Sequence, residues 1–110
     1  MTASKKPRIY GPGDYTVTVT DGSLLPWVRP GERVTVSRRT DLRDGDVGLF
    51  YSREGMVFRQ YCRDSQGNVY LFSVNRRERE KDLSIPAARF GEIVCYGRAM
   101  LKDRIPLPTD

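Results

Sequence analysis

Apolar and polar residues alternate along several short segments of this 110-residue chain, and that alternation limits the folds open to it. The period of two is plainest in Tyr15–Thr20 and Glu32–Ser37, both rich in β-branched residues. Successive side chains of a strand point to opposite faces of a sheet, so this pattern predicts strands with one buried face. No segment longer than about ten residues shows the 3.6-residue period of a helix. The chain is therefore predicted to be mainly β.

Further strands are predicted at close spacing in the middle of the chain: Val47–Ser52, Met56–Cys62 and Asn68–Ser73. The loops between them are short and contain glycine, which is typical of antiparallel hairpins. A polar segment, 74–88, follows, and residues 90–100 form a last apolar-rich stretch in which Gly97 is expected to mark a bend or bulge. Six or seven short strands with glycine-rich turns indicate a small rolled antiparallel sheet or a partly open barrel.

One domain is expected from a chain of this length. Residues 1–14 are rich in proline, glycine and lysine and are interpreted as a flexible tail or linker. The β domain is expected over residues 15–101. Residues 102–110 are interpreted as a C-terminal tail, because their two prolines are incompatible with a helix or a central strand. Trp27 either packs into the core or lines a former substrate cleft, and burial in the core is favoured because large aromatic side chains usually bury.

The composition excludes several kinds of site. The chain has no histidine, which removes His-based triads, His-ligated metals and imidazole acid–base catalysis. Its two cysteines, Cys62 and Cys95, are too few for a disulfide scaffold and are interpreted as buried thiols in a reducing compartment. No stretch has the ~20 apolar residues of a membrane span, and the N-terminus does not read as a secretory signal. We therefore expect a cytoplasmic protein that binds no membrane, metal or cofactor.

The net charge is +5, and fifteen of the nineteen cationic residues are arginine. A basic balance is compatible with nucleic-acid binding, for which Tyr51, Tyr61 and Tyr70 would offer rings for base stacking. The densest run of charge, residues 76–81, carries both signs and is interpreted as a solvated loop. A small basic β-barrel that binds nucleic acid is therefore one reading of the chain.

Several short motifs follow one another between residues 15 and 100. They are Asp-Gly-Ser-Leu-Leu-Pro at 21–26, Pro-Gly-Glu at 30–32, Asp-Gly-Asp-Val at 44–47, Val-Phe-Arg at 57–59, Leu-Phe-Ser-Val-Asn at 71–75 and Tyr-Gly-Arg at 96–98. In this order and spacing they resemble the C-terminal domain of LexA and phage repressors, the Ser–Lys self-cleaving peptidases. The fold that this resemblance implies agrees with the β-rich fold predicted above.

The resemblance places Ser23 at the position of the family's nucleophile and Phe58 at the position of its lysine. A serine hydroxyl needs an adjacent base, which in this family is a lysine kept neutral by burial. Phenylalanine cannot accept a proton, and the neighbouring Arg59 stays protonated and is expected on the other face of its strand. Of the four lysines, three lie in the predicted tails, and Lys81 is expected to be solvated and charged. Ser23 is therefore predicted to be a catalytic position without an activator.

The chain is accordingly interpreted as the regulatory and dimerisation domain of a LexA- or phage-repressor-type transcriptional regulator that has lost self-cleavage. The resemblance implies a homodimer that reaches DNA only through a helix-turn-helix domain outside this chain. The family cuts at an Ala-Gly or Cys-Gly bond upstream of its serine, and this chain contains neither dipeptide. The alternatives are an active serine peptidase of the same family, the nucleic-acid-binding barrel, and a plain interaction module that pairs through its sheet edges.

Overall fold

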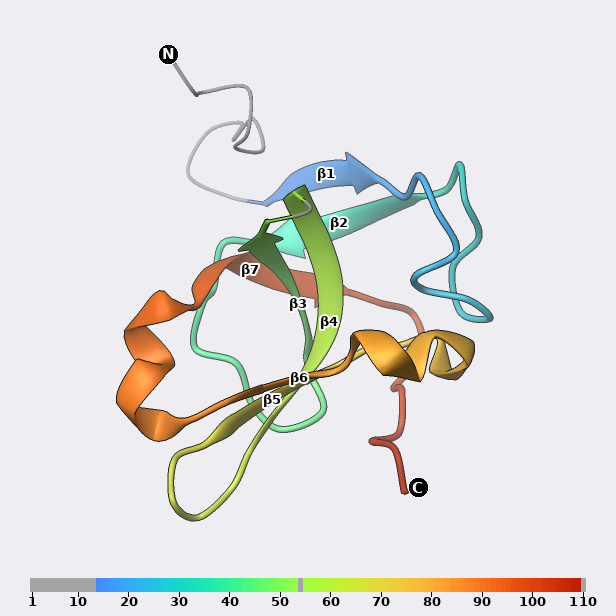
Figure 1. The fold of residues 1–110 in the computed structure, drawn as a ribbon. Helices are drawn as coiled ribbons and strands as arrows, with labels where there is room; N and C mark the ends of the chain where they lie inside the picture. The colour runs from blue at the N-terminus through green and yellow to red at the C-terminus, as the bar shows by residue number, and fades with distance from the viewer. Residues whose placement is uncertain (1–13, 54, 110) are drawn as a thin grey trace.

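The computed structural model describes residues 14–53 and 55–109, and its described strands form a single antiparallel sheet (Figure 1). The strand order across the sheet is β1-β2-β7-β3-β4-β5-β6. The strands are β1 (Tyr15–Thr18), β2 (Arg33–Ser37), β3 (Val47–Ser52), β4 (Gly55–Arg63), β5 (Val69–Phe72), β6 (Leu83–Ile85) and β7 (Val94–Met100). The prediction of a mainly β, antiparallel fold is confirmed. Most of the predicted N-terminal tail, residues 1–13, lies outside the described residues.

The middle of the sheet is the meander that the sequence predicts. β3 pairs with β4, and β4 pairs with β5, both antiparallel. The loop between β4 and β5 turns at Gly67, whose φ of 87° lies in the region that glycine adopts without strain. Asp64 holds this loop by accepting hydrogen bonds from the backbone N–H groups of Gln66 and Asn68. Short polar turns therefore fix the register of these strands.

The polar segment 74–88 contains structure that the sequence pattern does not reveal. The 3₁₀ helix η2 covers Arg76–Lys81, the strand β6 pairs with β5, and a second 3₁₀ helix, η3, covers Ala87–Glu92. The interpretation of residues 76–81 as a loop is therefore wrong in conformation, although none of them is buried. Helices this short show no 3.6-residue period, and β6 has three residues, too few for an alternation to be seen.

The last strand lies in the centre of the sheet, between β2 and β3. Its pairing with β3 shifts register between Leu49 and Phe50, opposite Gly97 and Cys95. Gly97 has a φ of 151° at this point, which confirms the predicted bulge. The sheet therefore depends on contacts between residues that are far apart in the sequence.

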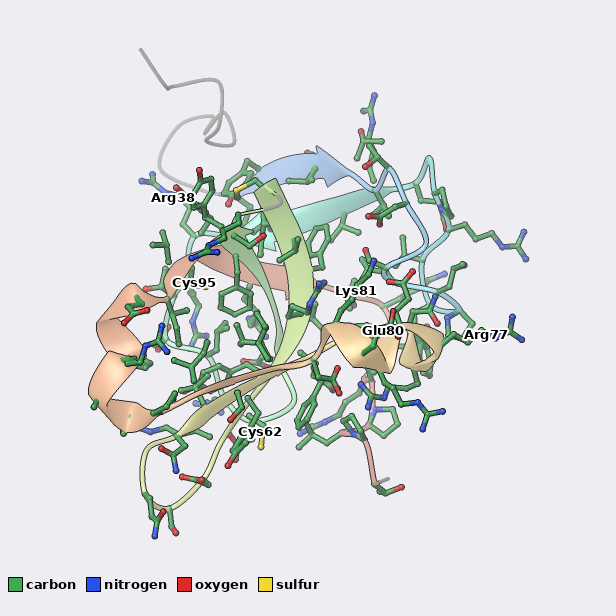
Figure 2. All side chains as sticks on the ribbon, in the orientation of Figure 1. Arg38, Cys62, Arg77, Glu80, Lys81 and Cys95 are labelled. Atoms are coloured by element: carbon green, nitrogen blue, oxygen red, sulfur yellow. The ribbon has the colours of Figure 1, made fainter. Side chains whose placement is uncertain are left out.

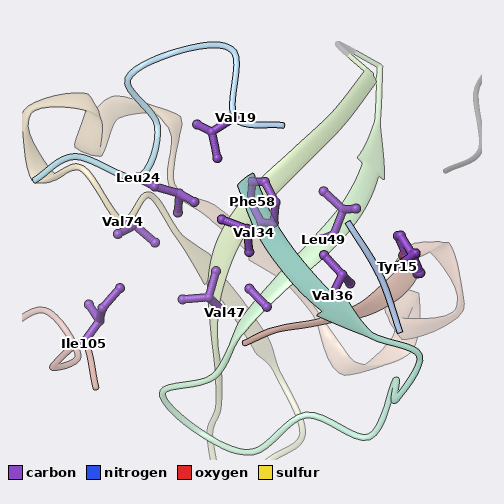
Figure 3. Packing of buried hydrophobic residues seen from close by; sticks show 11 residues of the cluster. Tyr15, Val19, Leu24, Val34, Val36, Val47, Leu49, Phe58, Val74 and Ile105 are labelled. Carbon is purple, nitrogen blue, oxygen red and sulfur yellow. The ribbon is translucent and has the colours of Figure 1, made fainter. Parts of the chain in front are cut away.

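The main core lies on one face of the sheet and includes the loop after β1 (Figure 3). Phe58 on β4 is only 5% exposed, and its strand partner is Leu49 on β3. The other buried members of this cluster are Tyr15, Val19, Leu24, Val34, Val36, Val47, Val74, Ala99 and Ile105. The alternating burial of β2, in which Val34 and Val36 face inward, follows the period of two in the sequence. The hydroxyl of Tyr15 donates to the Tyr96 carbonyl at 2.7 Å, and burial raises the pKa of Tyr15 to about 12.

A smaller cluster of Phe50, Val69 and Leu71 packs against residues that include Leu42 in the loop before β3, Ile85 on β6 and Ile93 after η3. Trp27 does not join either cluster. Its side chain is 38% exposed, so the expectation that it is buried is wrong. Leu24 is fully buried instead and anchors the same loop. No helix among the described residues is long and apolar enough to cross a membrane.

Candidate functional site

Ser23 lies in the loop that connects β1 to β2. The loop is closed at its base by two backbone hydrogen bonds, from the Val19 N–H to the Glu32 carbonyl at 2.8 Å and from the Gly31 N–H to the Val19 carbonyl at 2.7 Å. Beyond Ser23 the chain makes a tight turn, in which the Trp27 N–H donates to the Leu24 carbonyl at 2.8 Å. Because Leu24 is buried, this turn fixes the half-buried Ser23 against the body of the domain.

Asn75, the last residue of the Leu-Phe-Ser-Val-Asn motif, holds the serine loop from the other side. Its backbone N–H donates to the Ser23 carbonyl at 3.1 Å, and its side-chain Nδ2 donates to the Gly22 carbonyl at 2.9 Å. Its Oδ1 accepts from the Arg77 N–H at 3.1 Å and so caps η2. One side chain therefore ties the serine loop to η2. The motif is visible in the sequence, but this positioning role is not.

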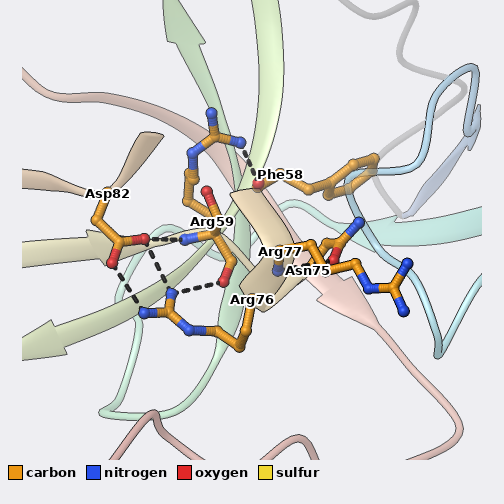
Figure 4. A network of polar contacts seen from close by, with 7 residues as sticks. Phe58, Arg59, Asn75, Arg76, Arg77 and Asp82 are labelled. Atoms are coloured by element: carbon orange, nitrogen blue, oxygen red, sulfur yellow. Dashed lines mark hydrogen bonds and ion pairs between the residues drawn. The ribbon is translucent and has the colours of Figure 1, made fainter. Parts of the chain in front are cut away.

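An ion pair fastens η2 to the end of β5 (Figure 4). The guanidinium of Arg76 donates two hydrogen bonds to the carboxylate of Asp82, at 2.9 and 3.0 Å. Asp82 also accepts from the Ser73 N–H at 2.8 Å, and Arg76 donates to the Ser73 carbonyl at 3.0 Å. A two-pronged pair of this kind fixes orientation as well as distance. It therefore sets which side of η2 faces the serine loop.

Ser23 and Phe58 line the same hollow, of about 90 Å³, as do Glu78 and Lys81 of η2. Val17, Val19, Leu49, Met56 and Val57 supply its apolar walls, and Asp21 and Arg59 also line it. The two candidate residues from the sequence are thus brought together, although they come from a loop and from a central strand. A hollow of this size holds a few atoms rather than a ligand, since ligand pockets usually exceed ~300 Å³.

Asp21 is the carboxylate nearest in sequence to the serine. The Ser23 N–H donates to its Oδ1 at 3.0 Å. Hydrogen bonding from the Ser23 side chain, followed by that from its backbone N–H, holds the pKa of Asp21 below its ordinary value despite partial burial. A carboxylate with a lowered pKa is a poor proton acceptor, so Asp21 orients Ser23 without activating it.

Lys81 reaches the hollow from the last residue of η2 and lies beside β4 (Figure 2). Its Nζ lies 3.6 Å from Glu78 Oε1, and its side chain is 45% exposed. Lys81 therefore lies beside a carboxylate and in contact with solvent, and is not enclosed in an apolar site. Arg59, whose Nη1 donates to the Phe58 carbonyl at 2.8 Å, is a guanidinium and stays charged. Lys81 is exposed, as expected, but the sequence pattern does not indicate its place at the hollow that Ser23 lines.

The thiols offer no substitute nucleophile. Cys62 and Cys95 are both free and half-buried. Burial is the largest cause that raises the pKa of each thiol, so both remain protonated near neutral pH. The described residues contain no group of three or more metal-ligating side chains that could hold an ion.

Comparison with known proteins identifies the family of this chain. The sequence pattern of the Peptidase S24-like family matches residues 4–98, which is most of the chain. The chain belongs to this family, which includes the C-terminal domains of LexA and phage repressors. A search of curated proteins finds no match.

Proposed function

We propose that this chain is the regulatory domain of a LexA- or phage-repressor-type transcriptional regulator in which the peptidase fold is kept and self-cleavage is lost. Phe58 carries the proposal. Its ring is buried at the hollow that Ser23 lines, and the resemblance assigns its position to the family's lysine. An aromatic hydrocarbon there fills space and cannot remove the serine proton.

The neighbours of Ser23 support the same conclusion. Lys81 is paired with Glu78 and partly exposed, and Asp21 has a lowered pKa because it accepts hydrogen bonds from Ser23. An activated serine needs a base that is neutral, or can become so, near the working pH. Of the described side chains that line the hollow, Arg59 is a guanidinium, Asp21 has a lowered pKa, and Lys81 is ion-paired and partly exposed rather than enclosed in an apolar site.

We predict that the domain does not cleave itself. The test is a fusion in which an Ala-Gly-containing linker precedes residue 14, incubated for a day between pH 7 and pH 10. Because Ser23 lacks a base, mass spectrometry should find the linker intact throughout. The control is the same fusion with Ser23→Ala. Fragments that form in the parent and not in this control would show an active peptidase and would contradict the proposal.

The same proposal includes assembly into a homodimer in the cytoplasm, with DNA reached through a DNA-binding domain outside this chain. An apolar surface around the edge strand β6 supports it. Leu83 on β6 is 46% exposed and lines a hollow together with Tyr51 on β3. The strand partner of Tyr51 is Val94 on β7, which is 43% exposed. Phe90 on η3 is 50% exposed. Among the described strands β6 pairs only with β5, and two copies of such an edge can meet about a two-fold axis.

Sedimentation equilibrium at micromolar concentration tests the dimer. We expect the parent to dimerise and Phe90→Ser to weaken dimerisation about tenfold or more, because a large exposed ring at an interface often dominates its energy. Trp27→Ser is the matched control, since Trp27 is an exposed aromatic away from β6. A parent that stays monomeric, or two variants with equal effects, would contradict this assignment.

A further inference from the structure

A second and larger hollow, of about 460 Å³, lies away from Ser23 between the loop before β3 and the segment after β7. Five cationic side chains from three separate segments line it: Arg39, Arg43, Arg98, Lys102 and Arg104. The three carboxylates in its lining are Asp44, Asp46 and Asp103. The lining contains no aromatic residue.

Two of these carboxylates are already committed to the protein backbone. Asp44 Oδ1 accepts from the Arg63 N–H at 2.9 Å, and Asp46 Oδ2 accepts from the Arg43 N–H at 2.9 Å. These bonds hold both carboxylates at the turns beside the hollow, whose lining carries five cations against three carboxylates, a balance of 5 − 3 = +2. Arg39 forms an ion pair with Asp41 at 3.1 Å, whereas the side chains of Arg43, Lys102 and Arg104 form no ion pair within the described part of the chain.

Arg98 forms the back of the hollow on the central strand β7. Its Nη2 donates to the sulfur of Met100 at 3.5 Å. Its Nε is buried and has no hydrogen-bond partner among the described residues. A buried guanidinium N–H without an acceptor costs free energy, because it has lost its water without replacement. An anion in the hollow would offer oxygen acceptors to the Arg98 guanidinium, whose Nη2 has a weak sulfur acceptor.

The walls of this hollow are braced by a single buried side chain. Gln60, which is 1% exposed, donates from Nε2 to the Gly45 carbonyl at 3.1 Å and to the Ile105 carbonyl at 2.8 Å. The first bond holds the loop before β3, and the second holds the segment after β7. Because Ile105 is itself buried in the core, the chain that carries Lys102 and Arg104 is fixed to the domain. The cationic groups are thus set on a rigid frame.

We propose that this basic hollow binds the phosphodiester backbone of a nucleic acid, independently of sequence. Guanidinium groups match phosphate oxygens in pairs, and several cations at one concave site neutralise successive phosphates. The lack of an aromatic platform excludes base stacking as the main contact there, so the site recognises backbone rather than bases. The proposal goes beyond the regulatory function above, in which DNA is reached through another domain.

Fluorescence anisotropy with a labelled 20-base-pair duplex and a 20-nucleotide single strand of arbitrary sequence tests the site, using the whole chain. We expect binding at 50 mM salt that weakens steeply as salt rises. The triple variant Arg43→Gln, Lys102→Gln, Arg104→Gln should bind about tenfold or more weakly. The plot of log binding constant against log salt concentration should also become less steep for this variant, its negative slope shrinking by about two to three. Each phosphate that a cation neutralises contributes roughly −0.9 to that slope. These side chains are exposed, so the fold should be unaffected.

The matched control is Arg29→Gln, Arg53→Gln, Arg77→Gln, which removes the same charge from exposed positions outside the hollow. Its affinity should fall by less than about threefold. Equal effects of the two triple variants would show a diffuse charge effect and would overturn the site, as would no binding at 50 mM salt. Tighter binding to phosphatidylserine vesicles than to DNA would overturn the choice of ligand. So would displacement of the labelled DNA by pyrophosphate that is as effective, per phosphate, as displacement by unlabelled DNA.

Discussion

Phe58→Lys should give the domain measurable self-cleavage. The substitution places an amine on β4 at the hollow that Ser23 lines, among the apolar side chains of Val17, Leu49 and Met56. Burial there lowers the pKa of the new lysine and makes it a base. General-base catalysis contributes typically ~10²–10⁴-fold, so cleavage of an Ala-Gly linker fused ahead of residue 14 should become measurable and should quicken with rising pH. Electrophoresis of timed samples, with mass spectrometry of the fragments, is the measurement.

The same variant should be less stable than the parent. It loses the burial of the Phe58 ring and places an amine in an apolar site, which together cost about 3–5 kcal/mol of unfolding free energy at pH 7. The folded-state pKa of this lysine lies below its unfolded value near ~10.4, so the unfolded chain binds more protons between the two values. The stability of the variant relative to the parent should therefore rise with pH through that window, as urea titrations would show.

Two controls separate chemistry from loosened structure. Adding Ser23→Ala to Phe58→Lys should abolish cleavage and leave the stability almost unchanged, because the nucleophile alone is removed. Phe58→Met keeps the site apolar and supplies no base, so it should not cleave. Equal cleavage with and without Ser23 would show that an outside protease cuts a destabilised protein, and would refute the arrangement inferred for this site.

The part of this site that could be read from the sequence is the part that depends on local pattern. The strand before Ser23 shows its alternation in the sequence, the strand that carries Phe58 is marked by short glycine-containing loops on both sides, and each has a recognisable short motif. The hydrogen bonds from Asn75 to the serine loop could not be read, because they join residues about fifty positions apart. Only the folded sheet brings β5 and its following turn beside the loop after β1.

Lys81 shows the limit of the same reasoning. Its exposure was predictable, because a lysine in a run of mixed charge is usually solvated. Its position beside Ser23 depends on η2, whose place is set by the Arg76–Asp82 pair and by the cap from Asn75. A short 3₁₀ helix held by side chains leaves no periodic signal in the sequence. The strand order could not be predicted from the sequence either. The last strand, β7, pairs with β2 and β3, which lie far from it in the sequence.

The central position of β7 requires glycine at residue 97, because the bulge on β7 lies directly against β2. A Cβ atom at residue 97 would overlap the Ser37 carbonyl oxygen and would lie 2.7 Å from Cγ1 of the buried Val36. The Ser37 oxygen belongs to the backbone of a paired strand, so it cannot move aside as a flexible side chain would. The φ of 151° adds strain for any residue other than glycine.

Gly97→Ala should therefore lower the unfolding free energy by about 3–5 kcal/mol, as the sum of backbone strain and overpacking. For a domain of ordinary stability this is a large fraction of the total, and Tm should fall by more than about 10 °C. Gly91→Ala is the matched control, since a Cβ at that exposed position in η3 meets nothing within 4 Å. Thermal and urea unfolding followed by circular dichroism should show the control within about 0.5 kcal/mol of the parent. If both variants unfold alike, the close approach of the Gly97 bulge to β2 is wrong, and with it the placement of the last strand in the middle of the sheet.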